Sequence, residues 1–383
     1  MSLGFAVTSG LALFLSLGID SANTFFSGRY RGNLRGLLVN SLLVSLCSAV
    51  LAFPLVALGF RAFGGTVFRD YPAEGQTVLT ILVPLQVLQL LLQGILVGLG
   101  LFRTLVAGAV LHYAVVLSAL SVTAGLRWSF LSVLLFWGGG LALSNLIFLG
   151  ALRPFVKAEM GSLRALLRNQ LRYGLRIMLG NIATLLNFRT DVYLIAYFLT
   201  PMHLGWYTLA SAIAEGLLYL PRAIAQVIFF AAANNARRIE VARIFRMGVV
   251  STTGVLLLSV PLVHYLVPAL LREAFQPAVL PAQILMFATF TYGLGLMATH
   301  YLYGKNEVLF PSKVALASAA LVVTLDFVFV PTYGIVGAAL CSLLAYALYG
   351  LLNLRRFLIA FGKSELMPGS RLSSDSVGSR VGV

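Results

Sequence analysis

Residues 187 to 230 read NFRTDVYLIAYFLTPMHLGWYTLASAIAEGLLYLPRAIAQVIFF, two apolar runs joined at Pro201 and Met202. With the apolar residues that precede it, each run is long enough to cross a bilayer as a helix, which takes about 20 residues. The short join leaves room only for a tight turn, so the runs predict an antiparallel helical hairpin in a membrane. Both runs also carry charges near their centres, which a membrane span keeps chiefly where they face protein or water.

The rest of the chain repeats this apolar pattern. Of its 383 residues, 60% are hydrophobic and 10% are charged, and the mean hydropathy is +0.94. A soluble domain of this length needs a more polar surface. Eleven apolar runs fall at 3–24, 37–60, 78–101, 104–125, 129–151, 173–200, 203–232, 246–270, 280–303, 310–331 and 334–359. Because backbone groups must be hydrogen-bonded within lipid and the alternating pattern of barrel strands is absent, we expect an all-α polytopic membrane protein.

The distribution of basic residues among the loops indicates the orientation of the chain in the membrane. The net charge is +15, which in a soluble protein would suggest nucleic acid. Here, however, 21 of the 27 basic residues lie in alternate loops, four lie in the opposite set, and Arg189 and Arg222 lie within spans. By the positive-inside rule the basic side, with the C-terminus, is cytoplasmic. We therefore expect contacts with anionic membrane lipids and no nucleic-acid partner.

Two observations predict a duplicated architecture. The motif Leu-Gly-aromatic begins the first span at Leu3 and the seventh span at Leu204. Eleven spans in this orientation would start the chain outside, so we expect a twelve-helix plan whose first helix is missing or is encoded upstream. The predicted domains are a five-span bundle at 1–152, a basic cytoplasmic linker at 153–172, a six-span bundle at 173–360 and a disordered cytoplasmic tail at 361–383. Internal repeats of this kind are common among transporters.

Counting residues from the predicted turn gives the depth of the charges. Arg189 lies 11 residues from Thr200, and Glu215 lies 12 residues from His203. At 1.5 Å per residue, both charges are about 16 to 18 Å from the outer surface, level on neighbouring helices. Asp191 lies about 200° around the helix from Arg189, so it faces elsewhere and shares its face with Asn187.

The seventh span carries a polar stripe at steps of three or four residues, and Pro221 within it predicts a kink. The stripe is Tyr207, Ser211, Glu215, Tyr219, Arg222 and Gln226. We predict that a wet substrate cavity is lined by Asn187, Arg189, Asp191, Tyr207, Ser211, Glu215, Tyr219 and Arg222. Arg189 and Glu215 could instead form only a structural clamp. Asp20 and Arg222 lie at similar inner depth in opposite halves and are a candidate cytoplasmic gate.

Other chemistry-bearing residues are isolated. Cys47 and Cys341 lie alone in separate apolar runs, and no metal-spaced cluster occurs, so we predict neither a metal nor a cofactor. His112, His264 and His300 read as packing residues, and Asp326 as a polar residue at a helix end.

Two stretches carry a resemblance to a known family. The first is residues 187–230, and the second is YLYGKNEVLFPSKVALASAALVVTLDFVFVPTYGIVGAALCSLLAYAL at 301–348, with a glycine-basic hairpin and a P-x-x-G-I-x-G-A-A turn. These resemble bacterial polysaccharide flippases, the Wzx-type O-antigen translocases of the multidrug/oligosaccharidyl-lipid/polysaccharide (MOP) exporter superfamily. The likeness departs at the N-terminus, where the family's first helix is missing, and at residues 229–233, where a proline often ends the span.

The resemblance implies export of an undecaprenyl-pyrophosphate-linked oligosaccharide from the inner to the outer leaflet of the bacterial inner membrane, by alternating access, for lipopolysaccharide synthesis. It implies a polysaccharide polymerase and glycosyltransferases as pathway neighbours. The membrane potential, or H+ or Na+ entering at Asp191 or Glu215, would drive transport. The alternatives are a cation-coupled multidrug antiporter of the same fold and a relative that transports nothing. A membrane enzyme is disfavoured because no sizeable extramembrane catalytic segment is present.

Overall fold

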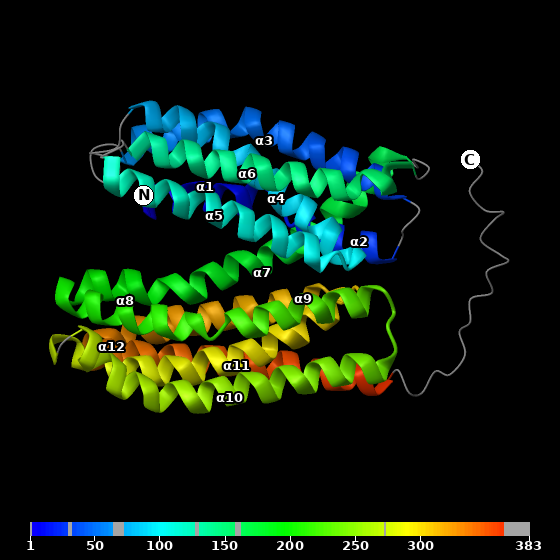
Figure 1. The fold of residues 1–383 in the computed structure, drawn as a ribbon. Coiled ribbons are helices and arrows are strands. Elements are labelled where there is room, and N and C mark those ends of the chain that lie inside the picture. Colours follow the sequence, from blue (N-terminus) through cyan, green and yellow to red (C-terminus); the bar gives the residue numbers. More distant parts are fainter. Residues whose placement is uncertain are drawn as a thin grey trace.

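The computed structural model describes residues 2–29, 33–63, 73–126, 130–157, 162–271 and 273–363, which are helical and contain no strand (Figure 1). The N-terminal elements are α1 Ser2–Leu15, α2 Ile19–Arg29, α3 Leu34–Phe63, α4 Ala73–Leu99, α5 Phe102–Leu126, α6 Phe130–Leu152 and the short 3-10 helix η2 Arg153–Lys157. The C-terminal elements are α7 Leu163–Phe198, α8 Pro201–Gly216, α9 Tyr219–Ala233, α10 Arg238–Leu271, η3 Glu273–Ala278, α11 Val279–Gly304 and α12 Leu309–Lys363.

These elements account for all eleven predicted spans. Among the described residues, seven helical segments are long and apolar enough to cross a membrane by length and composition. One of them, α12, holds two predicted spans and turns back at Gly334, whose φ of 61° is a conformation that favours glycine. The Ser318 hydroxyl donates a hydrogen bond to the Ala345 carbonyl at 2.7 Å, which places the two halves of α12 side by side. The all-α polytopic prediction is confirmed.

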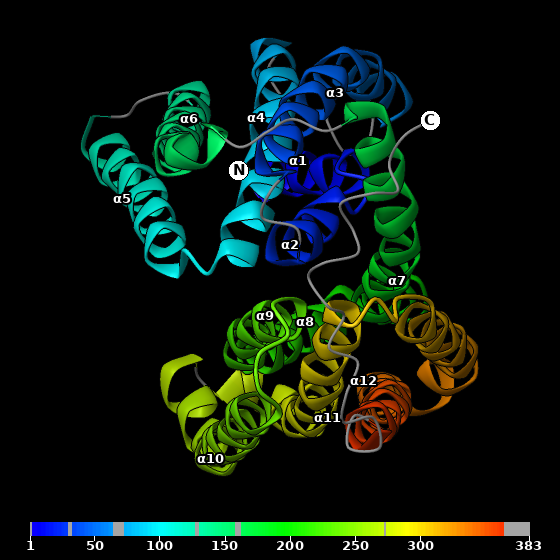
Figure 2. The same cartoon turned by 90° about the vertical axis from the view of Figure 1, so that its right-hand side faces the viewer.

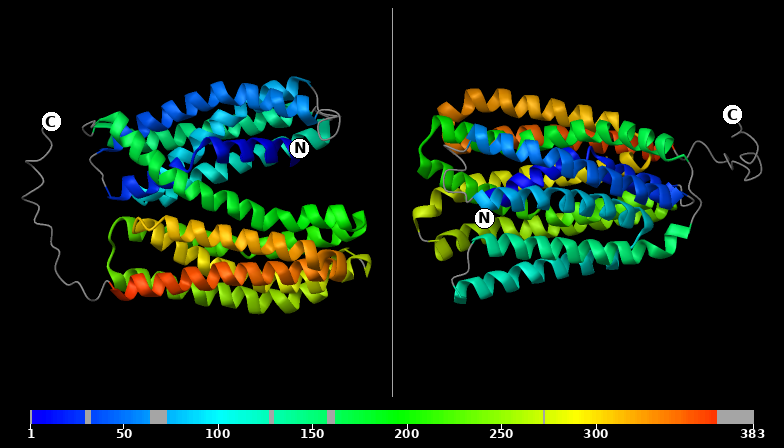
Figure 3. Two further views of the ribbon diagram at one scale, coloured as in Figure 1. Left: turned by 180° about the vertical axis from the view of Figure 1, so that it is seen from behind. Right: turned by 90° about the horizontal axis from the view of Figure 1, so that it is seen from above.

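The helices form two bundles (Figures 1 and 2). We call α1 to α6 the N-lobe, and α8 to α12 together with the C-terminal part of α7 the C-lobe. Helix α7 runs from the N-lobe into the C-lobe, as Figure 3 shows from behind, and packs mainly on α12. Apolar cores fill each lobe, and one further buried cluster, which includes Phe25 of α2 and Phe229 of α9, joins the two lobes.

The internal repeat is visible as a recurring break. The predicted first span is interrupted after α1, where Leu17 and Gly18 both have positive φ. The predicted seventh span is interrupted at Leu217 and Leu218, between α8 and α9. Aligning the two Leu-Gly-aromatic motifs requires a shift of 201 residues. The same shift aligns Leu17 with Leu218. The kink expected from Pro221 therefore occurs, and its counterpart in the N-lobe forms without a proline.

The linker and tail boundaries differ from the prediction. Residues 163–172 are the first turns of α7, which begins after Ser162, whose hydroxyl accepts a hydrogen bond from the Ala165 amide. The reason is Gln170, which is fully buried and bonds both Asn23 of α2 at 2.6 Å and Asn40 of α3 at 2.7 Å. These side-chain bonds anchor the start of α7 in the N-lobe. Residues 361–363 continue α12, and the rest of the predicted tail lies outside the described residues.

The lobes meet toward one end of the molecule. We call this the basic end; it holds residues 29, 99–102, 233–238 and 304–309, and the opposite end holds the turn between α7 and α8. Near the basic end the Asn234 side chain donates to the Gly98 carbonyl at 3.1 Å, and the rings of Phe102 and Phe230 lie 5.6 Å apart. Both contacts join the N-lobe to α9, so they hold the lobes together at this end.

The crossing of α2 over α4 depends on a glycine. A Cβ added at Gly94 would overlap with the Asp20 carbonyl, whereas one added at Gly59 on α3 would meet nothing within 4 Å. Close helix packing in membranes relies on such small residues. We expect Gly94→Ala to lower the free energy of unfolding by about 1 to 3 kcal/mol, a common cost of overpacking. Denaturant unfolding in detergent would measure this, with Gly59→Ala as the control; equal stability of the two variants would contradict it.

Candidate functional site

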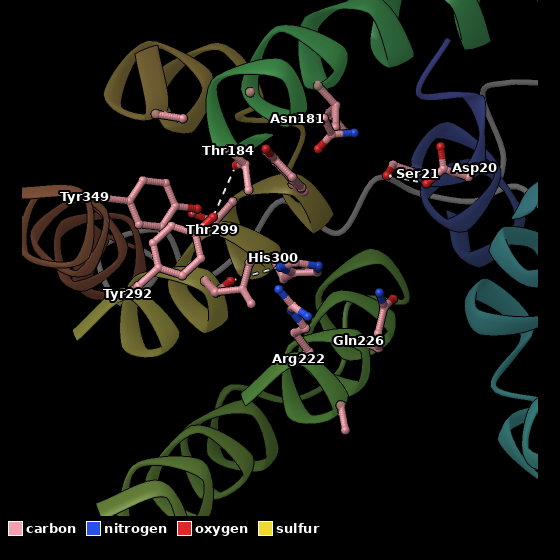
Figure 4. Close-up of a pocket in the computed structure, with 16 residues that line it drawn as sticks. Asp20, Ser21, Asn181, Thr184, Arg222, Gln226, Tyr292, Thr299, His300 and Tyr349 are labelled. Atoms are coloured by element: carbon pink, nitrogen blue, oxygen red, sulfur yellow. Dashed lines mark hydrogen bonds between the residues drawn. The ribbon is translucent and has the colours of Figure 1, made fainter. Parts of the chain in front are cut away.

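A cavity of about 440 Å³ lies at the junction of the two lobes (Figure 4). Its polar lining comes from both lobes: α2 provides Asp20 and Ser21, α7 provides Asn181 and Thr184, α9 provides Arg222 and Gln226, and α11 provides Thr299 and His300. A second cavity of about 410 Å³ adjoins it on the N-lobe side, since both are lined by Asp20, Ser21, Gln226 and His300. Helices α4 and α5 complete the second cavity. The two spaces form one polar region between the bundles, which we call the junction cavity.

Three groups of different charge face the junction cavity. Figure 4 shows Arg222 and His300 directed into the same space, with Asp20 across from them on α2. Arg222 makes no ion pair with any carboxylate in the described part of the chain. Asp20 accepts a hydrogen bond from the Ser21 hydroxyl at 3.1 Å through one oxygen, and its other oxygen is buried without a partner. His300 bonds the Leu296 carbonyl at 2.9 Å through Nδ1, which therefore carries the proton and leaves Nε2 as the acceptor.

A tyrosine pair forms part of the wall. The rings of Tyr292 and Tyr349 are stacked with centroids 4.4 Å apart. Thr184 bonds the Tyr292 hydroxyl at 3.2 Å, and Thr299 bonds the Tyr349 hydroxyl at 3.0 Å. These contacts hold the rings in place, so the wall offers fixed aromatic surface beside hydroxyl groups.

The structure separates the eight residues predicted to line one substrate cavity. Arg222 lines the junction cavity and the other seven do not. Arg189 and Glu215 do form the anticipated pair, at 3.2 Å between α7 and α8, with side chains 48% and 28% exposed. Tyr219 is 74% exposed and Ser211 is half-buried.

The remaining three, Asn187, Asp191 and Tyr207, lie inside the C-lobe. Tyr207, on α8, faces α7. The chain changes direction after Gly216, so Arg222 on α9 faces the other lobe. The polar stripe of the seventh span is therefore divided between the C-lobe interior and the junction cavity. The predicted gate residues Asp20 and Arg222 both line the junction cavity, from opposite lobes. Their gate role stays a prediction.

A buried polar cluster occupies the C-lobe interior; we define it as Asn187, Asp191, Tyr207, Asp326, Ser342 and Tyr346. Asp191 accepts hydrogen bonds from the Tyr207 hydroxyl at 2.5 Å and from the Val192 amide at 2.8 Å. Ser342 approaches the same carboxylate at 3.5 Å. Asp326 is fully buried, its oxygens accept no hydrogen bond from a nitrogen or oxygen donor in the described residues, and the weak donor Cys341 is its polar neighbour. A buried carboxylate without a strong donor or a cation beside it requires a proton or a cation.

Several residues of these two regions, Asp326 and His300 among them, were not predicted as site residues from the sequence. Asp326 was expected at a helix end, but the turn comes at Gly334, which leaves Asp326 inside the lobe. His300 was expected to pack, and it lines the junction cavity as well as contacting Phe229. The available signal was weak in both cases, since each is a single polar residue in an apolar span.

Comparison with solved structures identifies the fold. The chain resembles a multidrug resistance MATE family transporter of the MOP superfamily in its outward-facing conformation, with a TM-score of 0.76 and 16% identity over 95% of this chain and 87% of that one. It resembles a Pyrococcus furiosus MOP superfamily transporter with a binding pocket of reverse polarity at a TM-score of 0.69, 14% identity, and 94% and 86% coverage. A MATE transporter in complex with Rb+ matches at a TM-score of 0.66, 15% identity, and 94% and 90% coverage.

No protein-family model and no curated protein matches the sequence. At such low identities the structural likeness shows the fold alone, which is that of MATE transporters of the MOP superfamily. The chain is therefore a multi-pass membrane protein built from two bundles.

Proposed function

We propose that this protein is a flippase that moves an undecaprenyl-pyrophosphate-linked oligosaccharide from the inner to the outer leaflet of the bacterial inner membrane by alternating access. The observation that carries the proposal is the junction cavity. It combines the guanidinium of Arg222, which forms no ion pair within the described residues, with hydroxyl, amide and imidazole groups from both lobes. Arginine binds phosphate oxygens well, and hydroxyl and amide groups can hydrogen-bond to a glycan.

The arrangement of the lobes fits one step of such a cycle. Contacts between the lobes gather at the basic end, which the positive-inside rule makes cytoplasmic. The conformation then corresponds to an outward-facing state, the state in which a solved MATE neighbour was captured. A glycan head group would leave through the opposite end while its polyprenyl chain stays in lipid. A polymerase and glycosyltransferases would act on either side of this step.

The C-lobe polar cluster supports coupling to an ion. Carboxylate and hydroxyl oxygens are suitable ligands for a hard cation such as Na+, and either carboxylate could instead take H+. Asp191 and Asp326 provide two carboxylates whose charges would be costly without such a partner. A solved neighbour of the same fold binds Rb+. We propose that the coupling ion enters here and that the glycolipid occupies the junction cavity.

A cation-coupled multidrug antiporter is the second candidate, because a solved neighbour of this fold is a multidrug resistance transporter. Asp20 could bind a cationic drug. Against this reading, Arg222 and His300 face the same space, and a fixed positive charge opposes a cationic substrate.

The test is translocation in proteoliposomes that hold the full chain and a short undecaprenyl-pyrophosphate glycan. An impermeant glycosidase added outside reports the glycolipid that has reached the outer leaflet. We expect Arg222→Gln to slow translocation roughly tenfold or more, the usual effect of losing a hydrogen bond to a charged group. Arg243→Gln, an exposed α10 arginine outside both cavities, is the matched control and should transport normally. Transport of ethidium without any glycolipid movement would favour the antiporter instead.

A further inference from the structure

A third cavity, of about 400 Å³, lies at the basic end, apart from the junction cavity. We call it the seam pocket. Its lining residues come from both lobes and are Phe25, Phe26, Arg29, Asn169, Arg172, Tyr173, Arg176, Lys305 and Asn306. Four of these are cationic and none is acidic, so the pocket has a formal charge of +4.

No carboxylate in the part of the chain that the structure describes pairs with these positive charges. Lys305 donates a hydrogen bond to the Asn235 side chain at 3.3 Å, which is a neutral partner. Partial burial lowers the pKa of Lys305, and the nearby charge of Arg29 lowers it further. Arg29 of the N-lobe and Lys305 of the C-lobe therefore repel each other at the end where the two lobes are in contact.

Two aromatic side chains of the pocket lining join the lobes. The rings of Phe25 and Tyr173 stack with centroids 4.9 Å apart, and the Tyr173 hydroxyl donates to the Tyr303 carbonyl at 2.7 Å. These contacts link α2, α7 and α11 at the seam pocket. The cationic groups are thus held around one space whose width depends on how closely the lobes approach.

We propose that the seam pocket binds a phosphate group and that this anion holds the two lobes together at the basic end. Arg29 comes from α2, Arg172 and Arg176 come from the crossing helix α7, and Lys305 follows α11 in the C-lobe. Such groups can bind the oxygens of a phosphate, which arginine binds in a bidentate manner. A bound anion replaces repulsion across the seam by attraction, so it favours the conformation closed at this end. A phospholipid head group and soluble inorganic phosphate share this chemistry. The proposal concerns the equilibrium between conformations and does not require that the protein carries a glycolipid.

Lobe separation can be measured directly by pulsed electron paramagnetic resonance on the full chain. Cys47 and Cys341 are replaced by alanine, and spin labels are attached through Arg103→Cys and Ile239→Cys, two exposed sites near the basic end of opposite lobes. The protein is kept in a maltoside detergent at constant ionic strength. Inorganic phosphate, phosphatidylglycerol or chloride alone is then added in separate samples.

We expect phosphate or phosphatidylglycerol to raise the ratio of closed to open populations roughly fivefold or more, the usual scale of ligand coupling. A response to phosphatidylglycerol without a response to inorganic phosphate identifies the ligand as a lipid head group. A response to inorganic phosphate identifies the ligand as a soluble anion. Arg172→Gln and Lys305→Gln should lose the response, whereas the control Arg243→Gln, which does not line the pocket, should keep it. Arg172→Glu should be closed without any added anion, because its carboxylate supplies the negative charge.

The proposal is overturned if neither anion changes the ratio in the parent protein. It is equally overturned if Arg172→Gln and Lys305→Gln respond as Arg243→Gln does, or if Arg172→Glu opens. Each variant is compared only after size-exclusion chromatography shows a monodisperse protein.

Discussion

Asp191→Asn is expected to slow ion-driven glycolipid transport roughly hundredfold, within the range for a lost interaction with a charged group. Asparagine keeps the shape and can still accept the Tyr207 hydrogen bond, but it removes the charge that a coupling ion needs. Asp326→Asn should have a similar effect because it removes the second buried carboxylate of the C-lobe polar cluster while keeping the shape of the side chain. Transport into proteoliposomes under a Na+ or H+ gradient, at fixed membrane potential, measures this.

Glu240→Gln is the control for this experiment. Glu240 lies at the start of α10 and pairs with Arg237 at 2.6 Å, away from the C-lobe polar cluster. Normal gradient-driven transport by Asp191→Asn would show that the ion couples elsewhere. A loss that appears under one gradient and not the other would identify the ion.

The sequence was sufficient to predict most of the fold. Membrane thickness sets the length of each apolar run, so all eleven spans could be located from composition. Pro221 predicted the break between α8 and α9 because proline removes a backbone hydrogen bond. The equivalent break at Leu17 was not predicted, because no proline marks it and the local signal, Gly18 with its positive φ, is a single glycine in an apolar span.

The candidate sites were less predictable for a geometric reason. Helical periodicity gives the depth of a residue and its angle around the helix, and it correctly separated Arg189 from Asp191. It does not say whether a given face meets the interior of its own lobe, the other lobe or lipid. Tyr207 and Arg222 belong to one stripe, yet they serve different regions because the helix changes direction between them. His300 and Asp326 could be recognised only after distant helices were brought together.

The Arg189–Glu215 pair allows the clamp and substrate-path interpretations to be separated. Neither residue lines the junction cavity, so we expect the pair to act as a clamp between α7 and α8. Arg189→Gln or Glu215→Gln alone leaves one charge unpaired within the membrane, where such a charge costs about 2.5 to 3.5 kcal/mol. Each single variant should therefore still insert into the membrane, but its free energy of unfolding should be lower and its glycolipid translocation should be largely lost.

The reversed pair, Arg189→Glu with Glu215→Arg, restores the attraction between the two helices. Because the clamp depends on opposite charges and not on which helix carries them, we expect the reversed pair to recover both unfolding stability and glycolipid translocation. Thermal unfolding in detergent and the glycosidase assay measure the two properties on the same preparation. A reversed pair that is stable yet inactive would instead show that Arg189 contacts the substrate. Only a contact with the negatively charged glycolipid requires an arginine at that position.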